Sequence, residues 1–429
     1  MSAAIENLYD KFKKSGSVST DTRQITRGSV FFALRGDKFN GNEFAHDALE
    51  KGAAYAVIDE ASQARSDKYI VVDDALTSLQ QLARYHRDQL SIPVIGLTGS
   101  NGKTTSKELV NAVLSSKYKV LATKGNLNNH IGVPLTVLSI DSSVEVAVIE
   151  MGANHVGEIA SLCAIANPTH GFITNIGKAH IGTFGGFDNI VRGKSELYQH
   201  LINYNGVVWI NSQDKILSNM AKRFASPMFY PAKGDYYHCE MVSSDPFLKL
   251  MTETGEEISS NLIGAYNFDN IAVALAIGKY FNVPADDAKG AIENYRPANM
   301  RSQVVNKGTN TIILDAYNAN PSSMEVALRN LAQMKAKRKV AIVGDMYELE
   351  GESEKEHARI GELIKELRIE EGLLCGKLIQ SALTSNSDLK YFEDKRQLTE
   401  YLKANPISDA TILVKASRGM ALETIVDVL

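Results

Sequence analysis

The fold is decided by Val94-Ile-Gly-Leu-Thr98 and by the Gly99-Ser-Asn-Gly-Lys-Thr-Thr105 that follows it. A short apolar run of this kind predicts a buried strand, and we expect a helix to begin near Ser106. Gly99 and Gly102 allow the backbone to turn closely between the two. Successive amides and a helix N-terminus then face one point, which is a common way to hold phosphate.

The residue types in this turn indicate the ligand. Lys103 can reach the outer phosphates of a nucleotide, and the hydroxyl of Thr104 can bind Mg²⁺. The strict phosphate-loop pattern has a further glycine five residues before Gly102, where this chain has Leu97, so the loop is a variant. The alternative is an ordinary strand–turn–helix with a solvated lysine.

Strands and helices alternate on both sides of this loop, which is typical of α/β domains with mostly parallel sheets. Strands are predicted at 29–35, 53–59, 145–150, 171–174, 206–210, 311–315, 340–344, 372–375 and 411–415. Helices are predicted at 42–51, 76–90, 267–281 and after Gly419, and residues 229–262 are expected to be β-rich.

Breaks at Ser91-Ile-Pro93 and near Pro297 divide the chain into three predicted α/β domains. They are an N-terminal domain at 1–88, a central parallel-sheet domain with the phosphate loop at 89–297, and a Rossmann-like C-terminal domain at 298–429. The last lacks a Gly-x-Gly-x-x-Gly fingerprint, so its rhythm does not imply a dinucleotide.

Composition excludes several classes of protein. The chain has 429 residues, of which 44% are apolar and 22% charged, as in ordinary globular proteins. Its net charge of -4 provides no overall basic field for nucleic acid. No apolar run is long enough to predict membrane insertion. Three scattered cysteines and an N-terminal stretch without a basic or apolar segment predict a cytoplasmic protein.

Polar residues follow other predicted strands of the central domain. Glu150 ends the strand at 145–150, where a carboxylate beside a phosphate loop is well placed to bind Mg²⁺. It could instead merely cap the next helix. His180 lies in a glycine-rich loop expected at the same sheet edge, although a lone histidine is usually structural. Lys194 lies on a predicted helix, where most lysines are simply solvated.

Thr98-Gly-Ser-Asn-Gly-Lys-Thr-Thr105 resembles the phosphate loop of the Mur ligase family, and further matches extend over nearly the whole chain. The folylpolyglutamate synthetases share a related loop. The resemblance implies an ATP-dependent ligase in which Gly99, Ser100, Asn101, Gly102, Lys103, Thr104 and Thr105 hold the phosphates. It implies a metal site with Glu150, a second Mg²⁺ on His180, and a carbamylated Lys194 as a further metal ligand.

The resemblance also assigns residues to the nucleotide. Gly264-Ala-Tyr-Asn-Phe-Asp-Asn270 is similar to a family pattern, Gly-x-His-Asn-x-x-Asn, whose asparagines lie near the adenine. It implies that Asn267 and Asn270 do so here, although Tyr266 replaces the usual histidine. Arg301 matches a family arginine that reaches ATP, and Asp315 matches an acid that binds the ribose.

Two stretches resemble the branch of the family that adds D-alanyl-D-alanine to a UDP-N-acetylmuramoyl-tripeptide. They are Gly125-Asn-Leu-Asn-Asn-His-Ile-Gly-Val-Pro-Leu-Thr136 and Asp315-Ala-Tyr-Asn-Ala-Asn-Pro-Ser-Ser-Met324, and His130 stands where an acid is commoner. They imply an acyl-phosphate intermediate. The expected substrate-binding residues are Asn126, Asn128, Asn129, Asn318, Asn320, Ser322, Lys415, Ser417 and Arg418, and for the UDP moiety Ser19, Asp21, Arg23 and Asn40.

Three other readings remain at this point. A folylpolyglutamate-type ligase would share the loop and metal site but lack the UDP-binding domain. A phosphate-loop switch or transporter subunit would hydrolyse nucleotide without an acceptor, and a non-catalytic binding module would not need the reactive side chains. We expect the ligase to act as a monomer, without nucleic acid and without membrane insertion.

Overall fold

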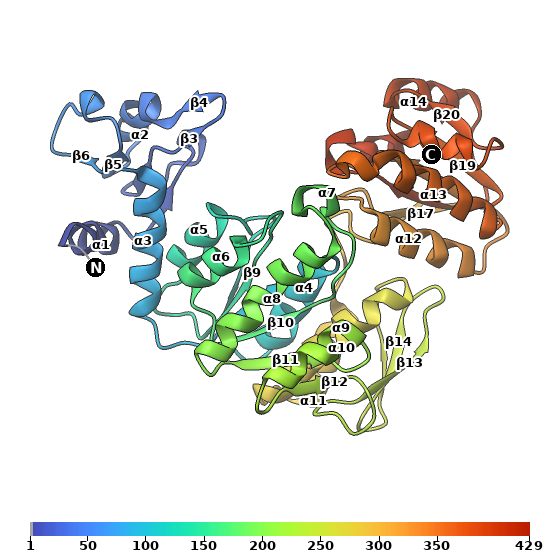
Figure 1. Cartoon of the computed structure of the whole chain (residues 1–429), viewed down its shortest axis with the longest axis horizontal. Coiled ribbons are helices and arrows are strands. Elements are labelled where there is room, and N and C mark those ends of the chain that lie inside the picture. Colours follow the sequence, from blue (N-terminus) through green and yellow to red (C-terminus); the bar gives the residue numbers. More distant parts are fainter. Residues whose placement is uncertain (1–2) are drawn as a thin grey trace.

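The computed structural model describes residues 3–429, so Met1 and Ser2, the first residues of the stretch inspected for a targeting signal, lie outside it. The chain forms three α/β domains, which follow one another along the molecule in Figure 1. The phosphate loop directly follows a strand of the central sheet and so lies at the carboxyl edge of that sheet. In the described residues no helix is both long and apolar enough to cross a membrane.

The N-terminal domain has a four-stranded parallel sheet in the order β1-β2-β5-β6. Its strands are β1 Val18–Ser19, β2 Val30–Phe32, β5 Tyr55–Ile58 and β6 Tyr69–Val71, with a small hairpin of β3 Arg35–Gly36 and β4 Phe39–Asn40. Its helices are α1 Ala3–Ser15, α2 Ala45–Glu50 and α3 Ala75–Asp88. The predicted strand at 29–35 is thus shorter, because the chain turns away after Phe32.

The central domain has a six-stranded, wholly parallel sheet in the order β12-β11-β10-β7-β9-β8. Its strands are β7 Val94–Thr98, β8 Val120–Ala122, β9 Val146–Glu150, β10 His170–Ile173, β11 Val207–Asn211 and β12 Met228–Tyr230. Alternate residues of β7 and β9 enter separate apolar cores, as strand geometry requires. Both faces of the sheet are therefore covered.

Helices and a small antiparallel sheet complete this domain. The helices are α4 Lys103–Ser115, α5 Gly132–Leu138, α6 Glu158–Ala166, α7 Ile181–Phe184, α8 Phe187–Asn203, α9 Lys215–Met220, α10 Phe268–Tyr280 and α11 Ala285–Asn294. The β-rich stretch predicted at 229–262 contains β12 and a three-stranded sheet of β13 Cys239–Ser243, β14 Lys249–Thr252 and β15 Glu257–Ser259.

The C-terminal domain has a six-stranded sheet in the order β16-β17-β21-β18-β19-β20, in which only β16 is antiparallel. Its strands are β16 Gln303–Lys307, β17 Asn310–Leu314, β18 Lys339–Gly344, β19 Glu371–Cys375, β20 Lys390–Phe392 and β21 Thr411–Lys415. Its helices are α12 Pro321–Gln333, α13 Ser353–Glu366 and α14 Lys395–Ala404. The helix predicted after Gly419 is a 3₁₀ turn, Leu422–Val428, preceded by Ala421 in a left-handed conformation.

Helix α3 joins the N-terminal domain firmly to the central domain (Figure 1). Leu79 and Leu82 belong to the same apolar core as Val133 and Leu162 of the central domain. The Arg87 guanidinium, which is 4% exposed, donates to the carbonyl of Ala166 at 3.1 Å. Because this contact is both apolar and hydrogen-bonded, the two domains share one continuous interior.

Candidate active site

The phosphate loop begins where buried β7 ends and closes into helix α4, which starts at Lys103. Gly99 has φ 149° and Gly102 has φ 80°, values that residues with a Cβ rarely adopt. A Cβ on Gly99 would lie 1.9 Å from Oγ1 of Thr174, and one on Gly102 would lie 2.6 Å from Oδ1 of Asn270. Both glycines are therefore required by conformation and by close approach.

A second loop, after β10, holds the phosphate loop in shape. The amide N–H of Ser100 donates to the carbonyl of Asn175 at 3.0 Å, and the Ser100 hydroxyl donates to the carbonyl of Gly177 at 2.9 Å. The amide N–H of Asn101 donates to Oδ1 of Asn175 at 3.0 Å. Asn175 thus supports the loop through both its backbone and its side chain.

Lys103 folds back over its own loop. Its Nζ donates to the carbonyl of Gly99 at 2.7 Å and lies 3.3 Å from that of Ser100. Burial lowers the pKa of Lys103, and Glu150 nearby partly opposes that effect. A lysine held in this way favours an anion that can replace its lost hydration.

Glu150 ends β9 inside the domain, where it is 1% exposed. Thr104 Oγ1 donates to its carboxylate at 3.0 Å, and the side-chain amide of Asn128 donates to it at 2.8 Å. Nζ of the buried Lys107 lies 4.0 Å away. Thr104 and Glu150 thus offer two neighbouring oxygen atoms as metal ligands, and oxygen is the type of ligand that Mg²⁺ prefers.

The C-terminal domain contacts the loops of the central domain through polar side chains. Asn320, which caps α12, donates from Nδ2 to Oδ1 of Asn101 at 2.9 Å. The amide N–H of Lys178 donates to the hydroxyl of Ser322 at 3.0 Å, and its Nζ pairs with Glu356 at 2.8 Å. These contacts place the predicted substrate residues Asn320 and Ser322 directly against the phosphate loop and its support.

His180, predicted from the resemblance as a ligand of a second metal, has a left-handed backbone at φ 58°. Its Nδ1 contacts the carboxylate of Glu348, which comes from the C-terminal domain. That contact lowers the pKa of Glu348. The imidazole of His180 therefore takes part in the contact between the central and C-terminal domains.

Lys194 lies on α8 and is wholly buried. Its Nζ donates to the carbonyl of Ala153 at 3.2 Å and lies 5.3 Å from the centre of the Phe184 ring. Burial, with a smaller effect from the charge of Lys103, lowers the pKa of Lys194 to about 7. The solvated-lysine interpretation is therefore wrong, although the resemblance had to draw attention to this residue.

The residues predicted for the nucleotide form two linked groups. In the central domain, Ser106 Oγ donates to Oδ1 of Asn270, whose Nδ2 donates to Oδ1 of Asn267, each at 2.8 Å. In the C-terminal domain, Asp315 Oδ2 pairs with Nζ of Lys415 at 2.6 Å. The asparagine side chains are thus fixed by Ser106 of α4, and the predicted ribose acid pairs with the predicted substrate residue Lys415.

One cavity of about 1290 Å³ unites these groups across the two domains. The predicted residues that line it are Ser100, Asn101, Gly102, Lys103, Thr104, Thr105, Asn126, Asn128, Asn129, Glu150, His180, Asn267, Asn270, Arg301, Asp315, Asn318, Asn320, Ser322 and Lys415. Its volume exceeds that of a typical small-ligand pocket, so it has room for more than one substrate.

Other predicted residues lie outside the lining. Gly99 and Lys194 do not line the cavity, and Gly99 with its φ of 149° begins the turn of the loop. The Ser417 hydroxyl accepts from the backbone N–H of Tyr347 at 2.9 Å, and Arg418 pairs with Glu423 at 2.6 Å. Both are therefore engaged within the C-terminal domain rather than in the cavity.

The residues predicted for the UDP moiety also lie outside the cavity, in the N-terminal domain. Asp21 accepts from Arg23 at 2.7 Å, and this hydrogen bond lowers the pKa of Asp21 to about 2. The Ser19 hydroxyl turns to the backbone of Asp21. Asn40 belongs to a separate polar cluster. Ser19, Asp21 and Arg23 thus contact one another, whereas the side chain of Asn40 is hydrogen-bonded to Glu60 and Asn42.

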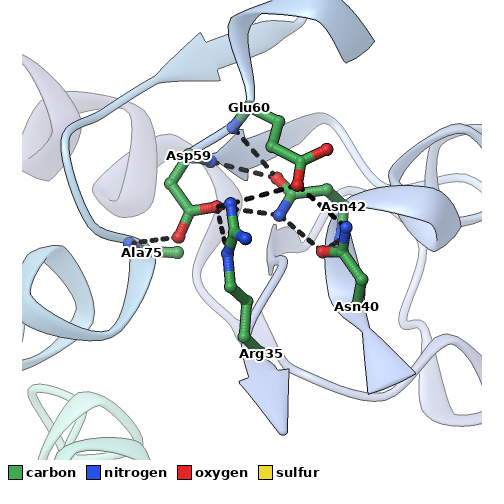
Figure 2. Close-up of polar contacts among 6 residues, drawn as sticks. All are labelled: Arg35, Asn40, Asn42, Asp59, Glu60 and Ala75. Atoms are coloured by element: carbon green, nitrogen blue, oxygen red, sulfur yellow. Dashed lines mark hydrogen bonds and ion pairs between the residues drawn. The ribbon is translucent and has the colours of Figure 1, made fainter. Parts of the chain in front are cut away.

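In that cluster, Arg35 comes shortly after β2, and Asp59 and Glu60 directly follow β5. Figure 2 shows their side chains beside those of Asn40 and Asn42. Asn42, which is 1% exposed, donates to Asn40 and Asp59 at 2.8 Å each and accepts from two backbone amides. Asp59 also pairs with Arg35 at 2.9 Å and accepts from the backbone N–H of Ala75 in α3. Because Asp59 is 17 residues from Asn42 and 24 from Arg35, no local pattern in the sequence shows that they meet.

Sequence reasoning missed other residues of the cavity. Gln80 of α3 lines it and donates to the carbonyl of His130 at 2.9 Å. Tyr317, Ser302 and Glu348 line it from the C-terminal domain. Gln80 lies on a surface of an amphipathic helix, where nothing in the pattern distinguishes it from a solvated residue. Within residues 3–429, no group of three or more His, Cys, Asp or Glu side chains is arranged as a preformed metal site.

Comparison with known proteins agrees with this architecture over nearly the whole chain. Three family descriptions match: "Mur ligase family, catalytic domain" at 15–95, "Mur ligase middle domain" at 97–278 and "Mur ligase, glutamate ligase domain" at 300–418. The chain is 36% identical to UDP-N-acetylmuramoyl-tripeptide–D-alanyl-D-alanine ligase of Bacillus subtilis over 423 residues, covering 95% of this chain and 92% of the relative.

Solved structures give the same result. Crystal structure I of MurF from Acinetobacter baumannii has a TM-score of 0.86 at 32% identity, covering 96% of this chain and 92% of its own. The MurF ligase of Thermotoga maritima, solved in complex with ADP, also has a TM-score of 0.86, at 24% identity and 100% and 98% coverage. With three domains, a shared cavity and full-length relatives in agreement, the chain belongs to the Mur ligase family.

Proposed function

We propose that this protein joins D-alanyl-D-alanine to the terminal carboxylate of UDP-N-acetylmuramoyl-tripeptide and converts ATP to ADP and phosphate. The observation that carries the proposal is the single cavity in which Lys103, Glu150, Arg301 and Lys415 meet from two domains. Relatives of 36% and 35% identity in Bacillus subtilis and Escherichia coli are named for this reaction. The ADP complex of the Thermotoga maritima ligase supports ATP as the nucleotide.

The chemistry must activate an unreactive acid. A carboxylate repels nucleophiles and would have to expel oxide, so its terminal oxygen first attacks the γ-phosphorus of ATP, which releases ADP and leaves an acyl phosphate. The amine of D-alanyl-D-alanine then attacks the acyl carbon, loses a proton and expels phosphate. Positioning and electrostatic stabilisation dominate phosphoryl transfer, and Lys103 and Arg301 provide positive charge beside the phosphate loop.

The buried pair of Thr104 and Glu150 fits a magnesium ion. The two side chains offer oxygen ligands 3.0 Å apart, and Mg²⁺ commonly takes one or two protein ligands together with substrate phosphates. When bound there, Mg²⁺ supplies neutralising charge to the phosphates. A second Mg²⁺ on His180 and carbamylated Lys194 is part of the proposal, and the low pKa of Lys194 supports it because only a neutral amine reacts with CO₂.

An acyl phosphate hydrolyses in open water, so the reaction benefits from a closed site. The contacts of Asn320 with Asn101 and of Lys178 with Glu356 join the C-terminal domain to the loops that hold the phosphates. We propose that these contacts make and break as the C-terminal domain closes and opens. A cytoplasmic location, favoured by three buried free cysteines, and a monomeric state remain predictions.

The experiment is phosphate release from ATP and Mg²⁺ with each acceptor omitted in turn. Turnover should require both the UDP-linked tripeptide and D-alanyl-D-alanine, and turnover that ignores both would reject the ligase. Lys103→Ala should abolish turnover, whereas Lys233→Ala, at an exposed loop of the same domain, should not. Glutamate addition to a folate with no response to the UDP-linked tripeptide would favour the folylpolyglutamate-type alternative.

A further inference from the structure

Tyr266 connects the central domain to the first residues of the C-terminal domain. It lies in the turn before α10, and its hydroxyl and that of Ser302 are 2.6 Å apart. Ser302 is 6% exposed and lies just before β16, beyond the predicted domain boundary. Burial, with a smaller effect from the charge of Asp315, raises the pKa of Tyr266, so the hydroxyl keeps its proton.

The ring of Tyr266 is held as firmly as its hydroxyl. Gly264 has φ 81°, and a Cβ at that position would lie 2.2 Å from Cε1 of Tyr266. The aromatic ring therefore packs directly on the backbone of the turn that precedes it. Asn267 and Asn270, which follow Tyr266, are hydrogen-bonded in series to Ser106 of α4.

The partner of Tyr266 stands in a strained turn. Met300 has φ 56° and Ser302 has φ 52°, in the left-handed region that residues with a Cβ adopt at a cost. Such conformations persist only where surrounding contacts enforce them. Between the two residues, Arg301 stacks on the Tyr317 ring, with 3.8 Å from its guanidinium carbon to the ring centre.

The same turn orients the predicted ribose acid. The amide N–H of Ser302 donates to Oδ1 of Asp315 at 3.2 Å, while Lys415 pairs with Oδ2 at 2.6 Å. Ser302 thus joins Tyr266 on one side to Asp315 on the other. Arg301, Ser302, Asp315 and Tyr266 all line the cavity.

We propose that Tyr266 is a positioning residue for the nucleotide, which acts by holding the 300–302 turn through Ser302. The hydrogen bond fixes the turn that directs Arg301 into the cavity and the Ser302 amide toward Asp315. This inference rests on the proposed use of ATP and adds a role for a residue that departs from the family pattern, which has histidine there. An imidazole has no hydroxyl beyond its ring, so a histidine would hold this turn differently.

The test compares Tyr266→Phe, Ser302→Ala and the double variant with wild type in the full-length protein. Tyr266→Phe keeps the ring and removes only the hydroxyl. Tyr118→Phe is the matched control. The hydroxyl of Tyr118 donates to the Phe281 carbonyl at 2.7 Å, and Tyr118 does not line the cavity. Readouts are KM for each substrate, kcat, and the Kd of ADP from titration calorimetry.

Loss of one hydrogen bond corresponds to roughly a three- to tenfold effect. We expect each single variant to raise KM for ATP and Kd for ADP by that factor, with a smaller change in kcat and none in KM for the dipeptide. The double variant should be no worse than the worse single variant. Because Asp315 would be less well oriented, discrimination between ATP and 3′-deoxy-ATP should also shrink.

Two results would overturn the inference. One is a Tyr266→Phe protein whose KM for ATP and Kd for ADP stay within twofold of wild type, even if its melting temperature falls. The other is a double variant whose effects multiply, since independent residues behave in that way. If wild type fails to turn over, the ligase proposal fails instead, and the ADP titrations still decide the role of Tyr266.

Discussion

Glu150 has two separable roles, as a partner of buried Lys107 and as the proposed metal ligand beside Thr104. Its carboxylate lies 4.0 Å from Lys107 Nζ, and the two side chains are 2% and 4% exposed. We therefore consider Glu150→Gln, Lys107→Met and the double variant. Glutamine keeps the shape and a hydrogen-bond acceptor for Thr104 but removes the negative charge.

The size of the effect follows from the distance. Two unit charges 4 Å apart attract by about 4 kcal/mol at an effective dielectric constant of about 20. Burial nevertheless lowers the pKa of Lys107 in spite of Glu150, so desolvation outweighs the attraction. Lys107 can thus release its proton when left alone, which limits the loss. We expect Glu150→Gln to lower the free energy of unfolding by about 2–3 kcal/mol.

The assay is chemical unfolding with EDTA and without nucleotide, so that only the ion pair is measured. Lys107→Met should cost less, because the remaining carboxylate keeps hydrogen bonds from Thr104 and Asn128. The double variant should regain at least half of the stability lost in Glu150→Gln. Turnover should stay about 10²–10³-fold below wild type in both variants that lack the carboxylate.

The coupling of Glu150 and Lys107 is refuted if the double variant loses as much stability as the two single variants together, because independent residues behave in that way. The role of Glu150 as a metal ligand is refuted if the double variant regains turnover along with stability. That outcome would make Glu150 a structural residue alone. Thr104→Ser, which keeps the hydroxyl, is the control and should retain most of the activity.

Three further outcomes are expected. A pKa of about 7 leaves roughly half of Lys194 neutral at pH 7. Activity should therefore rise with bicarbonate, and the native mass should show one added CO₂. A fully active Lys194→Met would show that the modification is not needed. Burial lowers the pKa of His170 to about 4, so protonation disfavours the fold and stability present above pH 6.5 declines toward pH 4. Relative to His170→Phe, wild type should lose up to about 3 kcal/mol over that range in pH-dependent unfolding, and parallel curves would refute it. Asn320→Asp keeps the cap of α12 but loses the hydrogen-bond donor to Asn101. We expect kcat/KM for ATP to fall roughly fivefold without a change in melting temperature. An unchanged kcat/KM would contradict the role of this contact.

Features encoded locally were predicted well from the sequence. The buried strand, paired glycines and Lys103 lie within a dozen consecutive residues, and Glu150 directly ends an apolar run. Lys103 and Glu150 lie beside one cavity because the strands that precede them are parallel, and parallel strands have their carboxyl ends at a common edge. The β-rich stretch after β11 was also recognised from its polarity.

Features that depend on distant pairing were not predicted. His180 and Glu348 are 168 residues apart, and no local pattern shows that they meet. β16 was missed because only two adjacent valines interrupt its polar residues, and its pairing with β17 stabilises it as the antiparallel edge. The expected terminal helix is a 3₁₀ helix, Leu422–Val428, which begins directly after the left-handed Ala421.

Helix α3 ties the N-terminal domain to the central domain along its whole length. Its first turn is anchored by Asp59, its middle by His130 and its last turn by Ala166, so it acts as a rigid strut between the first two domains. A long sugar-nucleotide that spans these two domains would lie between binding groups at a fixed separation. A substrate whose stem peptide is one residue shorter should therefore fail to reach the phosphates. The third domain meets the loops of the central domain through the polar contacts of Asn320 and Glu356 and through Ile181, which packs against its apolar core. Under the proposed closure, adjustment to the incoming amine would fall to that domain.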